Sequence, residues 1–336
     1  MKGLTAGVIG LGIGEQHIRA CQNTPDVAVT MVCDSDPDRL REIGQRYGVE
    51  RRVNDWRAVT DNPDIDVVTI ASYDNNHAEQ AMAALANGKH VFIEKPVCLS
   101  SQEANDIRAA LEASPGLKLS SNLPLRTCPR FARLRDAIRN GEMGQVYNIE
   151  ADYLWGRSHK LVAGWRRDMP YYSIVLGASI HMIDLVLWLK GEAPIEVSGL
   201  GSSLALGQHD LDFDDFAINL FRFADGSVAK VAAHGGCAHP HFHTVHAYGT
   251  DRSFHHDLAG AYWVDGSDPA AALRAETADY PAKAERGRVL GSFLASIQNP
   301  NMVPLISSED TFLTMNLAFA ADRAIREGQP QSFDCN

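Results

Sequence analysis

The first 121 residues alternate short apolar runs with segments of helical length, and this rhythm constrains the fold more than any other feature of the chain. Apolar runs bounded by turns are typical of buried strands, and strands separated by helices form parallel sheets. The sequence therefore predicts an N-terminal α/β domain with a doubly wound parallel sheet. Its strands are expected over residues 5–10, 27–33, 67–71, 90–93 and 117–121, and its helices from about residue 15 and over residues 39–47, 77–86 and 102–113.

After residue 122 the rhythm changes, because strand-like runs follow one another without helices between them. Such neighbours favour an antiparallel sheet. We predict two domains, residues 1–122 and residues 123–336, the second an α/β domain with an open, mostly antiparallel sheet. Its strands are expected over residues 145–155, 195–204, 215–223, 227–233, 242–248 and 252–258, and its helices over residues 130–140, 174–189, 286–297 and 309–326.

Charge and composition exclude several classes of function. With 31 basic and 42 acidic residues in 336, the net charge of −11 disfavours binding to a phosphate backbone. No apolar run approaches the roughly 20 residues that cross a bilayer. The six cysteines form no CxxC pair, which indicates reduced thiols in a cytoplasmic protein. We therefore expect neither a nucleic-acid partner nor a membrane partner.

A glycine-rich turn follows the first predicted strand and opens the first helix. Glycines permit a tight turn and let the backbone approach a pyrophosphate, which the helix N-terminus then attracts. The motif departs from G-x-G-x-x-G, because its last glycine comes one residue early. The candidate cofactor contacts in this turn are Gly10, Gly12, Ile13 and Gly14.

Asp34 ends the second predicted strand, about 20 residues after the turn. A carboxylate at that place can accept both ribose hydroxyls of NAD and repels the 2′-phosphate of NADP. The cofactor is therefore predicted to be NAD rather than NADP. The alternative is that Asp34 only caps the helix that begins near Pro37.

An acid, a base and a proline end the fourth strand, at Glu94, Lys95 and Pro96. Ligands of parallel sheets bind beyond the carboxyl ends of the strands. Proline fixes the turn, and a desolvated lysine can exchange protons near neutral pH. The alternative is a solvated strand end.

The oily segment 174–189 is interrupted by His181 and Asp184, which share one face of a helix. His181 could exchange a proton with a substrate hydroxyl, or be a satisfied core histidine. We expect Asp184 to orient the structure by pairing with an arginine.

Three segments together resemble the Gfo/Idh/MocA family of NAD(P)-dependent oxidoreductases: the glycine turn with His17, residues 88–96, and residues 180–184. The resemblance covers nearly the whole chain. It implies a Rossmann domain, a cis bond between Lys95 and Pro96, and catalysis by Lys95 and His181 beside the nicotinamide. Glu94 would help to position the cofactor. Sugars, inositols and related polyols are the implied substrates. Ser72 and His77, which follow the third strand, are further candidate cofactor contacts.

The chain departs from the family pattern at residue 177. Many members carry an aspartate four residues before the histidine, where this chain has Gly177. Asp168 and Tyr172 lie nearby in sequence, and either could stand in. Hydride transfer between NAD and a secondary alcohol or ketone carbon is therefore weighed against two alternatives. One is a non-catalytic regulator that binds NAD and a sugar. The other is a redox-neutral NAD-dependent enzyme acting on glycosides.

Aromatic and charged residues gather between positions 153 and 168. Aromatic faces and hydrogen-bond donors suit a polyhydroxylated ring, although a surface loop would carry similar residues. Together with His181, the candidate substrate contacts are Tyr153, Arg157, Trp165, Arg166 and Asp168.

Seven of the 13 histidines lie between positions 234 and 256. On a strand, His239, His241 and His243 would share one face, a spacing that could bind a metal. We predict instead neutral imidazoles lining a pocket or a subunit contact, with no metal. His255 and His256 are expected at the surface. The open sheet leaves one face to cover, so a homodimer or homotetramer is expected.

Overall fold

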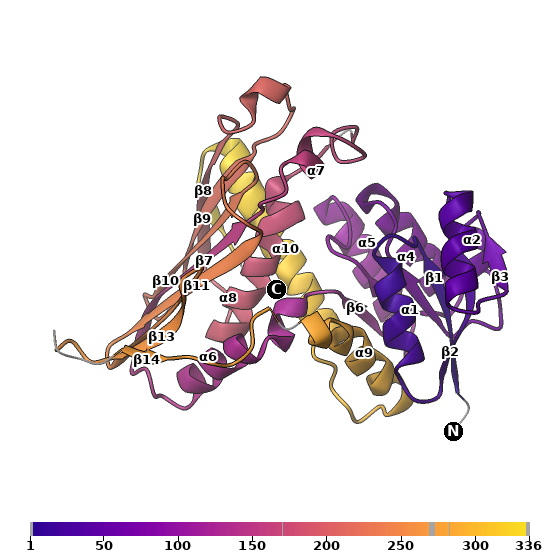
Figure 1. Cartoon of the computed structure of the whole chain (residues 1–336), viewed down its shortest axis with the longest axis horizontal. Helices are drawn as coiled ribbons and strands as arrows, with labels where there is room; N and C mark the ends of the chain where they lie inside the picture. The colour runs from indigo at the N-terminus through magenta and orange to yellow at the C-terminus, as the bar shows by residue number, and fades with distance from the viewer. Residues whose placement is uncertain (1–2, 170, 269–272, 282, 334–336) are drawn as a thin grey trace. The chain divides into compact units, whose positions relative to one another are not determined.

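The computed structural model describes residues 3–169, 171–268, 273–281 and 283–333. It divides the chain into two compact units, each of which is interrupted in sequence. The first unit comprises Met1–Pro124 and Ala284–Phe312, and the second comprises Leu125–Lys283 and Leu313–Asn336. Figure 1 labels the elements of both.

The first unit contains a six-stranded sheet in the order β3-β2-β1-β4-β5-β6, with every pair parallel. The strand order therefore reverses between β1 and β4, the place where doubly wound sheets bind ligands. The strands are β1 (Leu4–Ile9), β2 (Val27–Cys33), β3 (Arg51–Val53), β4 (Val67–Ile70), β5 (His90–Ile93) and β6 (Leu119–Ser121). The helices are α1 (Gly14–Gln22), α2 (Pro37–Arg46), α3 (Arg57–Thr60), α4 (His77–Ala86), α5 (Ser101–Glu112) and α9 (Arg288–Gln298).

Local signals in the sequence account for two helix starts. Asp36 caps α2 by accepting the backbone N–H groups of Asp38 and Arg39, and proline occupies the first turn. Ser100 and Glu103 form a reciprocal capping box at the start of α5. Both helices then return the chain to the amino ends of the next strands, which maintains the parallel order.

Helix α9 corrects the predicted division of the chain at residue 122. It comes late in the sequence, yet it packs against the parallel sheet. Phe293 and Leu294 lie in one buried cluster with Ala6, Val67 and Phe92. The rings of Phe92 and Phe293 are 5.7 Å apart. An apolar helix covers the nearest uncovered apolar sheet face, whatever its place in the sequence.

The second unit is built on a nine-stranded sheet in the order β14-β13-β12-β11-β7-β10-β9-β8-β15. Its neighbours are antiparallel except for the parallel pair of β7 and β10, so the predicted mostly antiparallel sheet is confirmed. The strands are β7 (Val146–Leu154), β8 (Glu196–Ser202), β9 (Phe216–Arg222), β10 (Val228–His234), β11 (Phe242–Gly249), β12 (Arg252–Asp257), β13 (Gly260–Asp265), β14 (Leu273–Ala275) and β15 (Gln331–Ser332).

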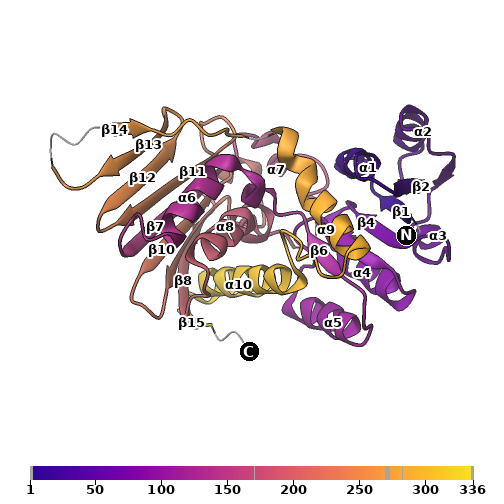
Figure 2. The same cartoon turned by 90° about the horizontal axis from the view of Figure 1, so that it is seen from below.

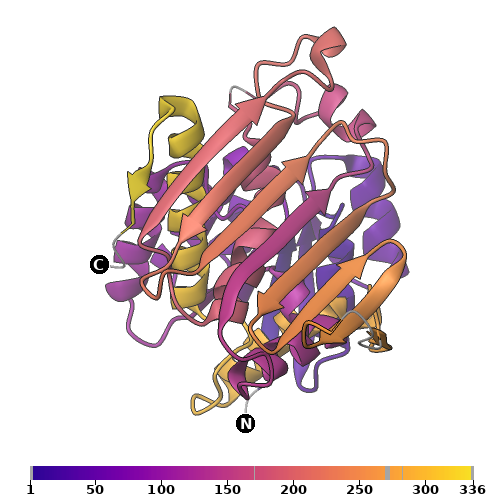
Figure 3. The ribbon, with the colours of Figure 1, turned by 90° about the vertical axis from the view of Figure 1, so that its left-hand side faces the viewer.

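The helices of the second unit lie on one face of this sheet, as Figure 2 shows for α6, α8 and α10. Figure 3 looks onto the other face, which no helix of the described residues covers. The helices are α6 (Pro129–Arg139), α7 (His159–Val162), α8 (Ile180–Lys190) and α10 (Ser308–Glu327), which begins in the first unit. A π-helical segment, η3 (Val175–Ser179), leads into α8. Short 3₁₀ turns occupy η1 (Asp74–Asn76), η2 (Pro124–Thr127), η4 (Gly207–His209) and η5 (Lys283–Gly287).

Within the described part of the chain, every helix is too short or too polar to span a bilayer.

Candidate active site

The glycine turn lies at the switch point of the parallel sheet, between β1 and α1. Gly10 has a φ of +83°, and a Cβ there would come 2.4 Å from the carbonyl oxygen of Ala71. Glycine is therefore required for the close approach of the loop to the end of β4. A Cβ on Gly12 would have nothing within 4 Å. The turn thus exposes backbone at Gly12 directly before the N-terminus of α1.

Asp34, directly after β2, stabilises this turn through hydrogen bonds. Its Oδ2 accepts the backbone N–H of Leu11 at 2.7 Å, and its Oδ1 accepts the N–H of Asp36 at 2.8 Å. The carboxylate is buried, with the Arg39 guanidinium 3.6 Å away. The helix-cap alternative is wrong, because Asp36 is the residue that caps α2.

Glu94 and Lys95 follow β5, and the bond between Lys95 and Pro96 is cis, as the family resemblance implied. Oε1 of Glu94 lies 3.1 Å from Nε2 of His17 and accepts a hydrogen bond from Asn122 at 2.6 Å. Burial by itself would raise the pKa of Glu94. Four interactions outweigh burial: the hydrogen bond with His17, the charge of His17, the hydrogen bond from Asn122 and the charge of Lys95. Together they hold the pKa of Glu94 below its usual value. An ionised carboxylate thus lies directly before Lys95, whose side chain is half-buried.

His77 and Ser72 hold the neighbouring backbone. Nδ1 of His77 lies 2.7 Å from the carbonyl oxygen of Pro96, and Nε2 lies 3.2 Å from that of Ser72. The Ser72 hydroxyl donates to Gln80 at 2.7 Å. His77 is fully buried, and both of its ring nitrogens lie near protein carbonyl oxygens. It can therefore influence a cofactor only by holding the Ser72 and Pro96 backbone in place.

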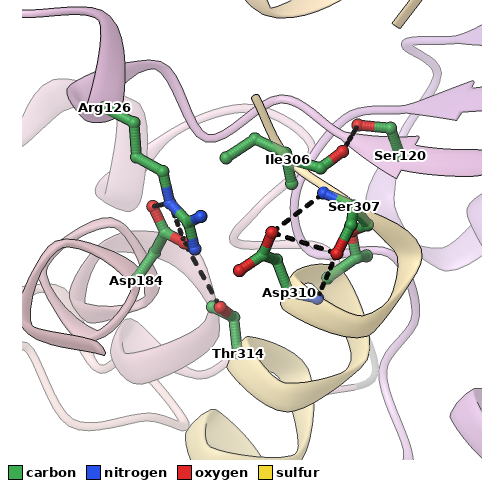
Figure 4. A network of polar contacts seen from close by, with 8 residues as sticks. Ser120, Arg126, Asp184, Ile306, Ser307, Asp310 and Thr314 are labelled. Atoms are coloured by element: carbon green, nitrogen blue, oxygen red, sulfur yellow. Dashed lines mark hydrogen bonds and ion pairs between the residues drawn. The ribbon is translucent and has the colours of Figure 1, made fainter. Parts of the chain in front are cut away.

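In the second unit, α8 carries His181 as a half-buried residue in an otherwise buried stretch. Asp184, one turn later, pairs with Arg126, as expected for an orienting carboxylate. Figure 4 shows the Arg126 guanidinium directed at Asp184, with Nη2 2.6 Å and Nε 3.1 Å from Oδ1. Thr314 of α10 donates to the same oxygen at 3.4 Å. This buried ion pair fixes α8 against its neighbours.

Residue 177, where many family members carry an aspartate, lies in the π-helical segment. A Cβ built on Gly177 would come 2.0 Å from the hydroxyl oxygen of Tyr172 and 2.7 Å from its Cζ. Tyr172 is buried, and its ring packs edge-on against Phe213 at 4.7 Å. Of the two neighbours considered as substitutes for the aspartate, Tyr172 therefore fills the space at residue 177. Asp168 is exposed.

Tyr153 is the centre of a ring cluster at the end of β7. Its ring stacks on His181 at 5.7 Å with an interplanar angle of 10°. It meets His241 edge-on at 5.2 Å and His243 edge-on at 4.9 Å. Nδ1 of His243 lies 2.7 Å from the hydroxyl oxygen of Tyr280. Tyr153 and His181, predicted separately from the sequence, therefore belong to one cluster.

The remaining predicted substrate contacts lie in the segment after β7. Arg166 lies over Trp165 at 4.1 Å and over Trp155 at 5.7 Å. Trp165 and Arg166 are half-buried, whereas Arg157 is exposed and has its carbonyl oxygen bonded by the Trp155 indole at 3.0 Å. The sequence thus identified two residues that pack together and two, Arg157 and Asp168, whose side chains lie at the surface.

Sequence reasoning missed His241, His243 and Tyr280 as members of the cluster. The predicted strand alternation placed both histidines on one face, but in the structure His241 lies directly before β11, and only the fold reveals that both rings pack against Tyr153. The described residues contain no group of three or more histidine, cysteine, aspartate or glutamate side chains arranged to hold a metal.

The expectation for His256 is wrong, because it is fully buried. Burial and the neighbouring charge of Arg130 lower its pKa to about 3.

Two family models match the chain along most of its length. Residues 4–121 match an oxidoreductase family with an NAD-binding Rossmann fold, and residues 131–255 match the Gfo/Idh/MocA C-terminal domain. The chain belongs to the Gfo/Idh/MocA family of oxidoreductases. Its first domain is therefore an NAD-binding domain, as the glycine turn and Asp34 predicted.

Relatives within the family support the same assignment. The chain is 27% identical over 265 residues to a levoglucosan dehydrogenase of Pseudarthrobacter phenanthrenivorans, covering 69% of this chain and 68% of the relative. It is 24% identical over 335 residues to a myo-inositol 2-dehydrogenase of Thermotoga maritima, covering 96% of each. The solved structure of a levoglucosan dehydrogenase in complex with NADH and levoglucosan has the same fold. It matches with a TM-score of 0.87 at 22% identity and covers 99% of this chain and 100% of that one.

Proposed function

We propose that this protein is an NAD-dependent dehydrogenase that transfers a hydride between NAD and a secondary alcohol or ketone carbon of a sugar, inositol or related polyol. The observation that carries the proposal is the Glu94-Lys95-Pro96 turn at the carboxyl end of β5 in an NAD-binding domain. Two relatives named as dehydrogenases of levoglucosan and myo-inositol support the substrate class.

The residues of the first unit fit NAD. Gly10, Gly12, Ile13 and Gly14 would hold its pyrophosphate, because the turn exposes backbone before a helix N-terminus. Asp34 would accept the ribose hydroxyls with the carboxylate lone pairs that the Leu11 and Asp36 amides leave available. When bound, NAD supplies the hydride acceptor. Ser72 and His77 would support the site by holding the Pro96 segment in place.

Lys95 is the residue proposed to hold the reacting hydroxyl and to accept its proton. The ionised carboxylate of Glu94 lies directly before it in the chain and would orient the turn from which it projects. A neutral lysine amine can accept the proton of a hydroxyl group that it holds, and the fixed turn would determine where that amine lies.

His181 is proposed as the second proton-transferring group. Tyr153 packs flat against its ring, and the Arg126–Asp184 pair immobilises the helix that carries it. A fixed imidazole can donate a hydrogen bond to the reacting oxygen or accept the proton of the reacting hydroxyl. Tyr153, Trp165 and Arg166 would contact the sugar ring. Arg157 and Asp168, whose side chains are exposed, would contact it from the solvent side.

The experiment is to mix the protein with NAD and a panel of cyclic polyols that includes levoglucosan and myo-inositol, and to follow the absorbance of NADH. We expect reduction with at least one polyol. Tight NAD binding without reduction across the panel would favour the non-catalytic regulator. Glycoside cleavage without net NADH would favour the redox-neutral reaction.

We further propose that the protein works in the cytoplasm as a homodimer or homotetramer. The sheet face without helices presents exposed apolar residues on neighbouring strands, among them Leu200, Leu220 and Val228. A second copy of the chain would cover this face, which a monomer leaves in water.

A further inference from the structure

The helical segment that leads to His181 begins after a serine with the hydrogen bonds of a helix cap. The hydroxyl oxygen of Ser173 accepts the backbone N–H of Val175 at 3.1 Å and that of Leu176 at 3.4 Å. Its carbonyl oxygen accepts the N–H of Gly177 at 2.8 Å. These bonds satisfy amide groups that the start of a helix would otherwise leave without partners.

Asp322 of α10 anchors this cap. Its carboxylate is buried, and Oδ1 accepts the Ser173 hydroxyl at 2.5 Å. Oδ2 accepts the hydroxyl of Tyr171, and it also accepts Nε–H of Arg326 at 3.0 Å. Burial of a carboxylate is unfavourable without such partners, and two of these three donors come from the segment directly before the helix. The Ser173 hydroxyl thus uses its one hydrogen and both lone pairs to join α10 to the start of that helix.

His181 lies just beyond the π-helical turn that follows this cap. Segment η3 precedes α8 directly, and the N–H of Ile180 bonds to the carbonyl oxygen of Val175, five residues earlier. His181 is the second residue of α8. Because α8 continues directly from the π turn, a displacement of that turn also displaces the His181 imidazole. Such π turns are rare and occur frequently at functional sites.

Two buried carboxylates therefore hold the helix, one on each side of His181. Asp184 lies three residues after the histidine and pairs with Arg126. Asp322 holds the Ser173 cap, eight residues before the histidine. The Asp184 pair alone leaves the amino end of the helix without an anchor, and proton transfer is sensitive to a misplacement of about 1 Å.

We propose that Ser173 and Asp322 are positioning residues that determine where His181 lies, acting through the π-helical turn. Without the Ser173 hydroxyl, the first amides of the helix lose their acceptor. Without the Asp322 carboxylate, the hydroxyl loses the partner that orients it. In both cases the amino end of the helix is released, and His181 leaves the position for proton transfer. The inference rests on the proposed function for what His181 does, whereas the contacts that place it stand independently.

The test compares the wild type with Ser173→Ala and Asp322→Leu. Ser173→Thr is the conservative variant, because it keeps a hydroxyl group at the cap. Tyr171→Phe is the matched control, because it removes a hydrogen bond to the same carboxylate and leaves the Ser173 cap in place. Thermal unfolding shows that each variant folds. If Asp322→Leu does not fold, Ser173→Ala decides the outcome.

The first measurement is of kcat and KM with a polyol that the wild type oxidises. We expect kcat to fall about ten- to a hundred-fold in Ser173→Ala and Asp322→Leu, because a small misplacement of a proton-transferring group lowers the rate by that much. KM for NAD should stay the same, since the residues proposed to bind NAD belong to the first unit. Ser173→Thr and Tyr171→Phe should keep most of the kcat. Unchanged kcat in Ser173→Ala, or an equal loss in Tyr171→Phe, would overturn the inference.

A second measurement does not depend on turnover and separates this inference from the proposed function. The ring signal of His181 is followed by NMR in protein with isotope-labelled histidine, and it is identified by its absence in His181→Asn. We expect the signal to shift in Ser173→Ala and to stay in place in Tyr171→Phe. That result without NAD reduction by the wild type would contradict the dehydrogenase and sustain the positioning role. A His181 signal that does not shift in Ser173→Ala would overturn the positioning role, whether or not the wild type is active.

Discussion

The hydroxyl oxygen of Tyr172 lies 2.0 Å from the position that a Cβ on Gly177 would occupy. A side chain at residue 177 would therefore have to displace the Tyr172 ring. Many family members place an aspartate there, four residues before the histidine. In this chain the same space contains the phenol group of Tyr172 instead of a carboxylate. The chain thus keeps the lysine and the histidine of the family pattern, at Lys95 and His181, but not its aspartate.

This relationship predicts that Gly177→Ala destabilises the protein by about 1–3 kcal/mol, because the new methyl group collides with a packed aromatic ring. In a Tyr172→Leu background the same substitution should cost much less, since the colliding atoms are absent. Urea unfolding of the single and double variants measures the coupling. Gly207→Ala, at an open position, is the control. Equal costs in the two backgrounds would contradict the packing described here.

Asp34 is predicted to set the preference for NAD over NADP. Asp34→Asn keeps an oxygen for the Leu11 amide but removes the charge that repels a 2′-phosphate, and Arg39 lies 3.6 Å away to attract it. The ratio of kcat/KM for NAD to that for NADP should fall roughly ten- to a hundred-fold. Asp38→Asn, the same change at an exposed neighbouring site, should leave the ratio unchanged. A ratio insensitive to Asp34→Asn would refute the assignment.

The helix-free sheet face is predicted to hold subunits together. Leu220→Glu places a charge at an exposed apolar position of β9 and should shift the assembly toward monomers in analytical ultracentrifugation. Leu204→Glu makes the same change in a loop outside the sheet and should have no effect. If Leu220→Glu sedimented as the wild type does, another surface would have to be the interface.

His256 makes stability depend on pH. It is neutral in the folded protein, with its pKa lowered to about 3, whereas an unfolded histidine titrates near 6.5. Between these values the unfolded chain binds more protons than the folded one. The contribution of neutral His256 to the free energy of unfolding is therefore fully present above about pH 6.5 and is lost as the pH decreases toward 3. One such group contributes up to ~1.4 kcal/mol per pH unit in that window.

The contribution of His256 is measured as the difference between the wild type and His256→Asn. The asparagine can still accept the hydrogen bond that Arg130 gives to Nδ1 of His256 but cannot titrate. Urea unfolding from pH 7 to pH 4 should show a shallower loss of stability in the variant, although its stability at neutral pH is lower. Parallel pH profiles would show that His256 does not control the dependence.

Much of the fold was predictable because its signals are local. Apolar runs that alternate with segments of helical length identified the parallel sheet, and β2, α4 and β5 have the bounds that the pattern predicted. Strand β3 was missed, since its Arg51-Arg52-Val53 stretch is too short and too polar to stand out. Strand β14 was missed because it has only three residues, all exposed, whereas β13 was missed although its Tyr262, Trp263 and Val264 favour a strand.

The candidate site was predictable where a motif specifies it and not where packing does. Lys95 and Asp34 end buried strands, which is itself a sequence signal. The position of Tyr172 over Gly177 has no sequence signal, because the contact depends on how a π-helical turn is packed. The burial of His256 was also hidden, since adjacent residues of a strand face opposite sides and only the fold shows which side is covered.

The most direct measurement follows the transferred hydrogen. A polyol that the panel identifies is prepared with deuterium on the carbon that is oxidised, incubated with NAD and the protein, and the recovered NADH is analysed by mass spectrometry. The proposed function predicts deuterium on the nicotinamide ring with the wild type, and a rate of label transfer reduced at least a hundred-fold in Lys95→Met. NADH without deuterium, or undiminished transfer in Lys95→Met, would contradict the account.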